Sequence, residues 1–175
     1  METRDTIFET SALPRVQAAL TGIKRLQGVC TSSKKPITRQ VLKKLISSLS
    51  MGMLDSYTSL MLKAVMTTAF FGFLRCGEFT IDQVYNKHVH LSLQDLVFYQ
   101  DRADLTLKQS KTDPFRKGVT ITLYATSNDL CPRSALFNYL KRRNSKFITS
   151  RQAESPLFLM SDGQALTRKY FIDKL

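Results

Sequence analysis

Residues 60–74 form the most apolar stretch of the chain, and Arg75 follows directly after them. The pattern predicts a helix over residues 56–73, with Asp55 or Ser56 as its N-cap. Because this stretch is apolar on nearly every side of the predicted helix, we expect the helix to lie at the centre of the core. The stretch is shorter than a membrane span and contains a lysine, so it does not predict a transmembrane helix.

The arginine at the end of this stretch is the first candidate functional residue. A guanidinium beside an apolar helix is expected to lack free access to water, so it needs an anionic partner. That partner is either Glu78, three residues on, or an anion from outside the chain. Gly72 and Gly77 bracket Arg75, and flexible backbone suits a turn that aims one side chain. Taken by themselves, the same residues also fit a structural ion pair.

The charge of the chain indicates which external anion to expect. Among 175 residues there are 26 lysines and arginines against 14 acidic residues, a net charge of +12. Such an excess favours a polyanion such as nucleic acid, because binding releases counterions from the phosphate backbone. Ribosomal and membrane-surface proteins share this balance. No apolar signal-peptide core occurs near the N-terminus, so we expect a soluble intracellular protein.

Neither a metal site nor a cofactor site is expected from the motifs. The cysteines, Cys30, Cys76 and Cys131, are far apart and form no Cys-x-x-Cys pair. His88 and His90 would share one face of a strand, but no third cluster of ligands accompanies them. The sequence also has no phosphate-binding glycine loop and no nucleophile elbow of a hydrolase.

The N-terminal part predicts one helix and a linker. Residues 14–27 have apolar residues at helical spacing and begin with a proline, which is favoured in the first turn. Residues 28–35, rich in Gly, Ser, Thr and Lys, predict the linker. A second helix is expected to begin after Thr38 as its N-cap. Its predicted buried face comprises Val41, Leu42, Leu45, Ile46 and Leu49.

The second half of the chain changes to strand periodicity. Alternating apolar residues predict three short strands over residues 96–99, 103–109 and 118–124. Further helices are expected from Pro132 to Asn144 and after Thr167. The predicted fold class is therefore α+β and mainly helical, with the helices packed on a small three-stranded antiparallel sheet.

The loop between the second and third predicted strands carries the second candidate, Lys111. A lysine at a hairpin tip can neutralise a phosphate, or protonate a leaving oxygen if nearby cations lower its pKa. Arg116 and Lys117 would add charge in the same loop. A solvated turn lysine explains Lys111 equally well when it is taken alone. Taken by themselves, the remaining basic runs, at residues 24–25, 34–35 and 141–143, are more often solvated faces than binding sites.

The succession of these segments resembles the catalytic domain of the tyrosine recombinase (phage integrase) family, with closest similarity to recombinases of eukaryotic DIRS-type mobile elements. The resemblance covers residues 14–175. The matching motifs, in order, are Phe-Gly-Phe-Leu-Arg-Cys-Gly-Glu at 71–78, Ser-Lys-Thr-Asp at 110–113, Cys-Pro at 131–132, Pro-Leu-Phe at 156–158 and Leu-Thr at 166–167.

This resemblance implies a division of the chain and a set of roles. Residues 1–35 would be a tail, the last helix of a core-binding domain and a linker, and residues 36–175 an incomplete catalytic domain. Arg75 would be the first catalytic arginine, Glu78 its acidic support and Lys111 the lysine that protonates the leaving oxygen. The expected partner is double-stranded DNA, bound as a multimer by the full-length protein. Side chains expected to contact DNA are Lys24, Arg25, Arg116, Lys117 and Arg168.

The family's His-x-x-Arg box and nucleophilic tyrosine, expected after the helix that Thr167 caps, are missing from the sequence. Residues that act as one catalytic unit lose nearly all activity when a key member is removed. We therefore expect a DNA-binding fragment, nuclear by family resemblance, that is inactive alone. The alternatives are a non-catalytic basic DNA-binding module and a decayed mobile-element remnant without a partner. The tyrosines are interpreted as packing or surface residues: Tyr57, Tyr85, Tyr99, Tyr124, Tyr139 and Tyr170.

Overall fold

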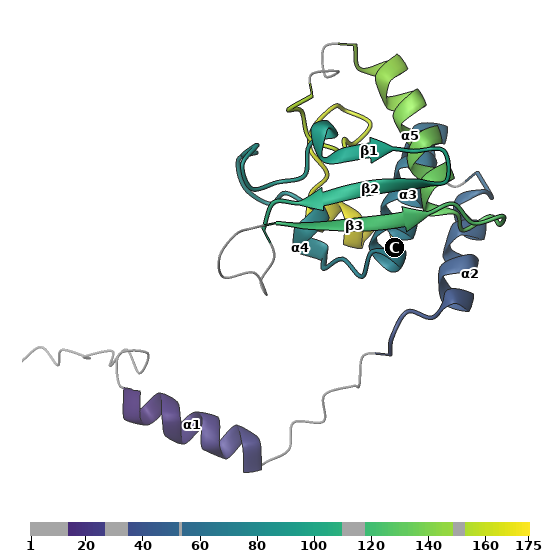
Figure 1. The fold of residues 1–175 in the computed structure, drawn as a ribbon. Helices are drawn as coiled ribbons and strands as arrows, with labels where there is room; N and C mark the ends of the chain where they lie inside the picture. Colours follow the sequence, from purple (N-terminus) through teal and green to yellow (C-terminus); the bar gives the residue numbers. More distant parts are fainter. Residues whose placement is uncertain (1–13, 27–34, 53, 110–117, 149–152) are drawn as a thin grey trace, which may run out of the picture. The chain divides into compact units, whose positions relative to one another are not determined.

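A computed structural model describes residues 14–26, 35–52, 54–109, 118–148 and 153–175 (Figure 1). The chain divides into two compact units, Met1–Pro36 and Ile37–Leu175. In the first unit the described element is helix α1 (Pro14–Leu26), close to the predicted bounds. Its apolar residues Leu20, Ile23 and Leu26 are exposed. No helix among the described residues is long and apolar enough to cross a membrane.

Helix α3 (Ser56–Phe71) lies at the centre of the second unit, as predicted. Asp55 is its N-cap, and a carboxylate oxygen of Asp55 accepts a hydrogen bond from the Thr58 backbone N–H at 3.0 Å. Helices α2 (Arg39–Leu49) and α5 (Pro132–Lys146) pack against α3. Because both neighbours and the sheet cover it, α3 is buried around most of its circumference.

The N-cap predicted for α2 is also confirmed, but its predicted buried face is too wide. The Thr38 hydroxyl accepts a hydrogen bond from the Val41 N–H. Leu42 and Ile46 are buried, whereas Val41 is exposed. Leu45 and Leu49 are half-buried against the core, so the predicted face is wrong only at Val41, because α2 packs on one side of α3.

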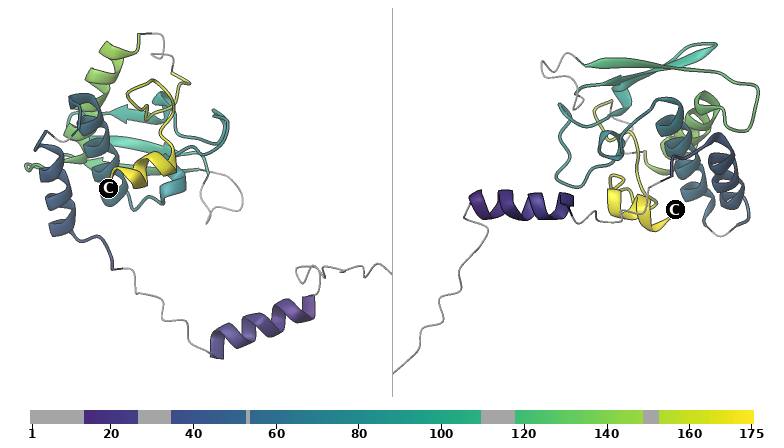
Figure 2. Two further views of the ribbon diagram at one scale, coloured as in Figure 1. Left: turned by 180° about the vertical axis from the view of Figure 1, so that it is seen from behind. Right: turned by 90° about the horizontal axis from the view of Figure 1, so that it is seen from below.

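The three predicted strands form one antiparallel sheet in the order β1-β2-β3. The strands are β1 (Leu96–Phe98), β2 (Arg102–Leu107) and β3 (Val119–Tyr124). The register aligns Leu96 with Leu105, and Leu105 with Ile121. This alternation turns apolar residues toward the helices. The view from below in Figure 2 shows the sheet as one layer and the helices of this unit as the other. The predicted fold class is confirmed.

Two buried tyrosines hold the segment before the last helix against α3 and α5. The Tyr57 hydroxyl donates a hydrogen bond to the Leu159 carbonyl at 3.0 Å. The Tyr139 hydroxyl accepts from the Leu159 N–H at 2.8 Å and donates to the Leu157 carbonyl at 3.2 Å. Burial raises the pKa of both phenols, so both remain protonated.

Arg143 corrects the interpretation of residues 141–143 as a solvated face, because its side chain is 0% exposed. One terminal nitrogen of its guanidinium donates to the Pro156 carbonyl at 2.8 Å and to Ser155 Oγ at 3.0 Å. Lys141 and Arg142 remain exposed. The basic run therefore contributes one structural arginine, whose hydrogen bonds to a distant segment offset the cost of burying its charge.

The chain ends with helix α6 (Arg168–Asp173), capped by Thr167 as predicted. Phe79 of helix α4 (Cys76–Phe79) packs edge to face on Phe171 of α6, with ring centroids 5.2 Å apart. The Ile81 N–H donates to the Leu166 carbonyl at 2.8 Å. The helix that follows Arg75 is thereby fixed to the last helix of the structure.

Candidate phosphate-binding site at the end of helix α3

Arg75 lies in the short connection between α3 and α4, where it is the N-cap of α4. Its backbone N–H donates to Glu78 Oε2 at 2.8 Å, and its Nη1 lies 3.4 Å from Glu78 Oε1. The side chain of Arg75 is 55% exposed and that of Glu78 is 12% exposed. One largely buried carboxylate thus contacts both the backbone and the guanidinium of Arg75, which restricts the orientations that this arginine can take.

This exposure corrects the expectation that Arg75 lacks access to water. Helix α3 ends at Phe71, four residues earlier, and the connection carries Arg75 away from the apolar helix to the beginning of α4. Its guanidinium can therefore meet an anion from solvent without any rearrangement of the core. A planar guanidinium offers paired donors that match the oxygens of a phosphate.

The structure gives Gly72 a role other than the backbone flexibility that the sequence suggested. Gly72 has φ −90°, which any residue can adopt. A Cβ at Gly72 would lie 2.8 Å from the Thr68 carbonyl oxygen, so a close approach of the backbone requires this glycine. The left-handed conformation belongs to Phe73, with φ 52°. The Leu74 N–H then donates to the Ala69 carbonyl at 2.9 Å, which closes the end of α3.

Lys111, Arg116 and Lys117 fall in residues 110–117, outside the described residues. Their predicted proximity to Arg75 therefore stays a prediction. The strand ends on either side of this loop are described. Gly118, the residue before β3, has φ 74°, and a Cβ there would lie 2.8 Å from the Leu107 carbonyl oxygen. A glycine is therefore needed where the loop rejoins the sheet.

Lys108, directly after β2, is a lysine whose role sequence reasoning missed. Its ammonium group lies 2.6 Å from Asp95 Oδ2, and it donates to Ser92 Oγ and to the His90 carbonyl at 2.9 Å each. Three acceptors use all three donors of an ammonium group. Lys108 is therefore a structural residue, and it is not available to an external phosphate. No sequence pattern points to this pair, because its partners come from separate segments.

The other predicted DNA contacts lie in both units. Arg25 is exposed on α1. Lys24 belongs to the same helix, but its side chain is not among those that the structure describes. Arg168 is the first residue of α6 and is exposed, and its backbone N–H donates to Asp82 Oδ1 at 2.8 Å. Since α6 packs on α4 through its phenylalanine pair, Arg168 belongs to the same part of the second unit as Arg75.

The two histidines do not lie on a strand, which corrects that part of the prediction. They belong to a turn over residues 86–90, in which His90 Nδ1 accepts a hydrogen bond from the Asn86 N–H at 2.9 Å. The His90 ring stacks on Tyr85, whose hydroxyl donates to the Glu154 carbonyl. Within the described ranges, no group of three or more His, Cys, Asp or Glu side chains could hold a metal ion.

No family model matches the chain, and no curated protein matches its sequence. Among solved structures, the chain resembles the crystal structure of XerH site-specific recombinase bound to difH substrate in a pre-cleavage complex. The TM-score is 0.55 at 15% sequence identity, over 91% of this chain and 45% of that one. The chain thus spans less than half the length of that protein. At this identity the likeness concerns the fold alone: this chain shares the fold of part of that site-specific recombinase.

Proposed function

We propose that this chain is the DNA-binding part of a site-specific DNA recombinase, in which Arg75 binds the non-bridging oxygens of one backbone phosphate. The observation that carries the proposal is an exposed guanidinium oriented by Glu78, on a fold shared with a recombinase bound to its substrate. The net charge of +12 supplies the long-range attraction to a polyanion.

The chemistry of each group follows from its charge. The positive charge of the Arg75 guanidinium would neutralise the charge of the phosphate that it binds. Glu78 limits the motion of that guanidinium, which lowers the entropy cost of placing it. We assign to Lys111 the donation of a proton to the leaving oxygen. Arg25, Arg116, Lys117, Arg168 and Lys24 would neutralise flanking phosphates.

We further propose that residues 1–175 bind DNA without cleaving it. The sequence contains no His-x-x-Arg motif, and two of its six tyrosines, Tyr57 and Tyr139, are buried. In this proposal residues 1–35 belong to a core-binding part and residues 36–175 to the catalytic domain. A DIRS-type origin would place the protein in the nucleus, and the full-length protein would act as a multimer on DNA.

The test is the affinity for a labelled DNA duplex, measured by fluorescence anisotropy at several salt concentrations. Arg75→Gln should weaken binding and lower the slope of log K against log salt by about 0.9, the share of one phosphate contact. Arg142→Gln is the matched control, because Arg142 is exposed on α5. Equal effects of the two variants would contradict a specific role for Arg75. Absence of binding even at low salt would instead support the decayed remnant.

A further inference from the structure

Phe73 combines a strained backbone with an exposed aromatic ring. It has φ 52° and is the only non-glycine residue with positive φ among the residues that the structure describes. Its side chain is 93% exposed. The residue occupies the position after the C-cap of α3, where the hydrogen bond from the Leu74 N–H to the Ala69 carbonyl requires a left-handed residue.

Folding alone would favour a different residue at this position. The left-handed conformation brings the Cβ of an L-residue too close to its own carbonyl oxygen, and glycine avoids this clash. A phenyl ring normally offsets such strain by burial, but Phe73 gains almost none. Phe73 therefore lowers the free energy of unfolding in two ways: its backbone is strained, and its apolar ring is exposed to water. Such a residue points to a function outside the folded chain.

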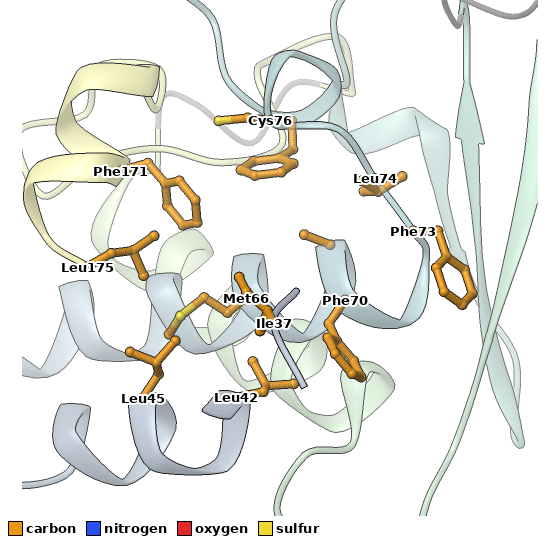
Figure 3. A pocket seen from close by; sticks show the side chains of 12 residues that line it. Ile37, Leu42, Leu45, Met66, Phe70, Phe73, Leu74, Cys76, Phe171 and Leu175 are labelled. Atoms are coloured by element: carbon orange, nitrogen blue, oxygen red, sulfur yellow. The ribbon is translucent and has the colours of Figure 1, made fainter. Parts of the chain in front are cut away.

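The surroundings of Phe73 narrow the choice of partner. It lies at the margin of an apolar pocket of about 500 Å³. Figure 3 shows its ring apart from Leu42, Leu45 and Met66, of which Leu42 and Met66 are buried. Two residues further along the chain is Arg75, whose guanidinium is open to solvent. A partner that covers Phe73 therefore meets a segment of the chain that also carries an exposed positive charge, which favours an anionic partner.

We propose that the Phe73 ring makes an apolar contact with duplex DNA, beside the phosphate that Arg75 binds. This inference rests on the proposed function. DNA presents the required pair of surfaces, since each phosphate is flanked by the carbon atoms of a deoxyribose and by base steps whose faces become accessible when the step is partly unstacked. Phenylalanine is among the side chains that proteins insert between base steps from the minor groove. The contact would add apolar binding free energy to the electrostatic term of Arg75.

The variant Phe73→Gly separates binding from stability. Removing the strained, exposed ring should leave the midpoint of urea unfolding unchanged or raise it. The affinity for duplex DNA should fall about tenfold, because the apolar contact is lost while the phosphate contacts remain. The slope of log K against log salt should not change, because no phosphate contact is removed. Phe73→Leu should retain part of the affinity, since it keeps an apolar side chain.

Val84→Ala is the matched control, because Val84 is an apolar side chain that is 90% exposed in another loop. It should leave DNA affinity unchanged. Wild-type affinity in Phe73→Gly would overturn the DNA contact while leaving the proposed function intact. A lower unfolding midpoint would show that the ring is structural and would also overturn it. Loss of self-association without DNA, measured by sedimentation, would assign the ring to a second copy instead. If the wild-type chain does not bind DNA, the proposed function itself fails.

Discussion

The ammonium group of Lys108 lies 2.6 Å from Oδ2 of Asp95 in a largely buried ion pair. The same carboxylate oxygen accepts hydrogen bonds from the backbone N–H and the hydroxyl of Ser92, both at 2.7 Å. Lys108 directly follows β2, and Asp95 ends a short 3₁₀ helix, η2 (Leu93–Asp95). The pair therefore ties the strand end that precedes residues 110–117 to the segment before β1.

Lys108→Met should destabilise the fold strongly, because it leaves the Asp95 carboxylate buried without its cation. Breaking one partner of a buried ion pair costs about 3 to 5 kcal/mol of unfolding free energy. The double variant Lys108→Met with Asp95→Leu should recover part of this loss, since it removes both charges. Urea unfolding at pH 7 measures both effects.

The control for this prediction is Lys87→Met, which breaks the exposed ion pair between Lys87 and Glu154. Surface ion pairs are screened by water, so the unfolding free energy should hardly change. Similar losses in Lys87→Met and Lys108→Met would show that burial does not decide the energetics of the Lys108 pair.

Tyr139→Phe should destabilise the chain more than Tyr57→Phe. The Tyr139 hydroxyl is the acceptor for the Leu159 N–H, and its removal leaves a buried donor without that bond. Such a loss costs about 2 kcal/mol, whereas losing the bond from Tyr57 to the Leu159 carbonyl, with its longer contact of 3.5 Å to the Tyr139 hydroxyl, costs about 1 kcal/mol. Tyr124→Phe, in an exposed ring, should have no effect. Denaturant titrations of the three variants give the ranking, and the reverse order for the buried pair would contradict it.

The elements that sequence analysis predicted correctly depend on local chemistry. The caps at Thr38, Asp55 and Thr167 each bond to a backbone N–H three residues away, so the nearby sequence is enough to identify them. The strands follow from alternation, because successive side chains point to opposite faces of a sheet. The apolar run of α3 requires burial on several sides, which places this helix in the core.

The features that were missed depend on residues far apart in the sequence. Arg143 appears in a basic run, and only the distant carbonyl of Pro156 and hydroxyl of Ser155 explain its burial. Lys108 meets Asp95 only after the strands have paired. At the candidate site, the ion pair of Arg75 with Glu78 follows from their spacing of three residues. The exposure of Arg75 does not follow from that spacing, since it depends on where α3 ends.

Stability should fall as the pH decreases through the range in which His90 titrates. Burial, with a further contribution from the charge of Lys108, holds the pKa of His90 below its ordinary value of 6.5. The unfolded chain therefore binds the proton more readily than the folded one, so acid favours unfolding. Asp55 and Glu154 have lowered pKa values and remain ionised over this range, so they should not contribute.

The measurement is the unfolding free energy at pH 7.5 and at pH 5.5, at constant salt, for the wild type and for His90→Gln. The wild type should lose more stability between the two pH values than the variant, which has no imidazole at this position. His88→Gln is the control, because His88 is exposed in the same turn. An equal pH dependence in wild type and His90→Gln would contradict the assignment to His90.

Glu78→Gln should weaken DNA binding through Arg75 rather than through its own charge. The carboxylate contacts the Arg75 backbone at 2.8 Å and its guanidinium at 3.4 Å, so the neutral amide would hold the arginine less firmly. Removing a negative charge near DNA has the opposite effect, since it lowers repulsion of the phosphates. A double-mutant cycle with Arg75→Gln separates the two contributions. If Glu78 acts by orienting Arg75, Glu78→Gln lowers affinity in the wild type but not in the Arg75→Gln background. An equal rise in affinity in both backgrounds would show that Glu78 acts on DNA only by repulsion.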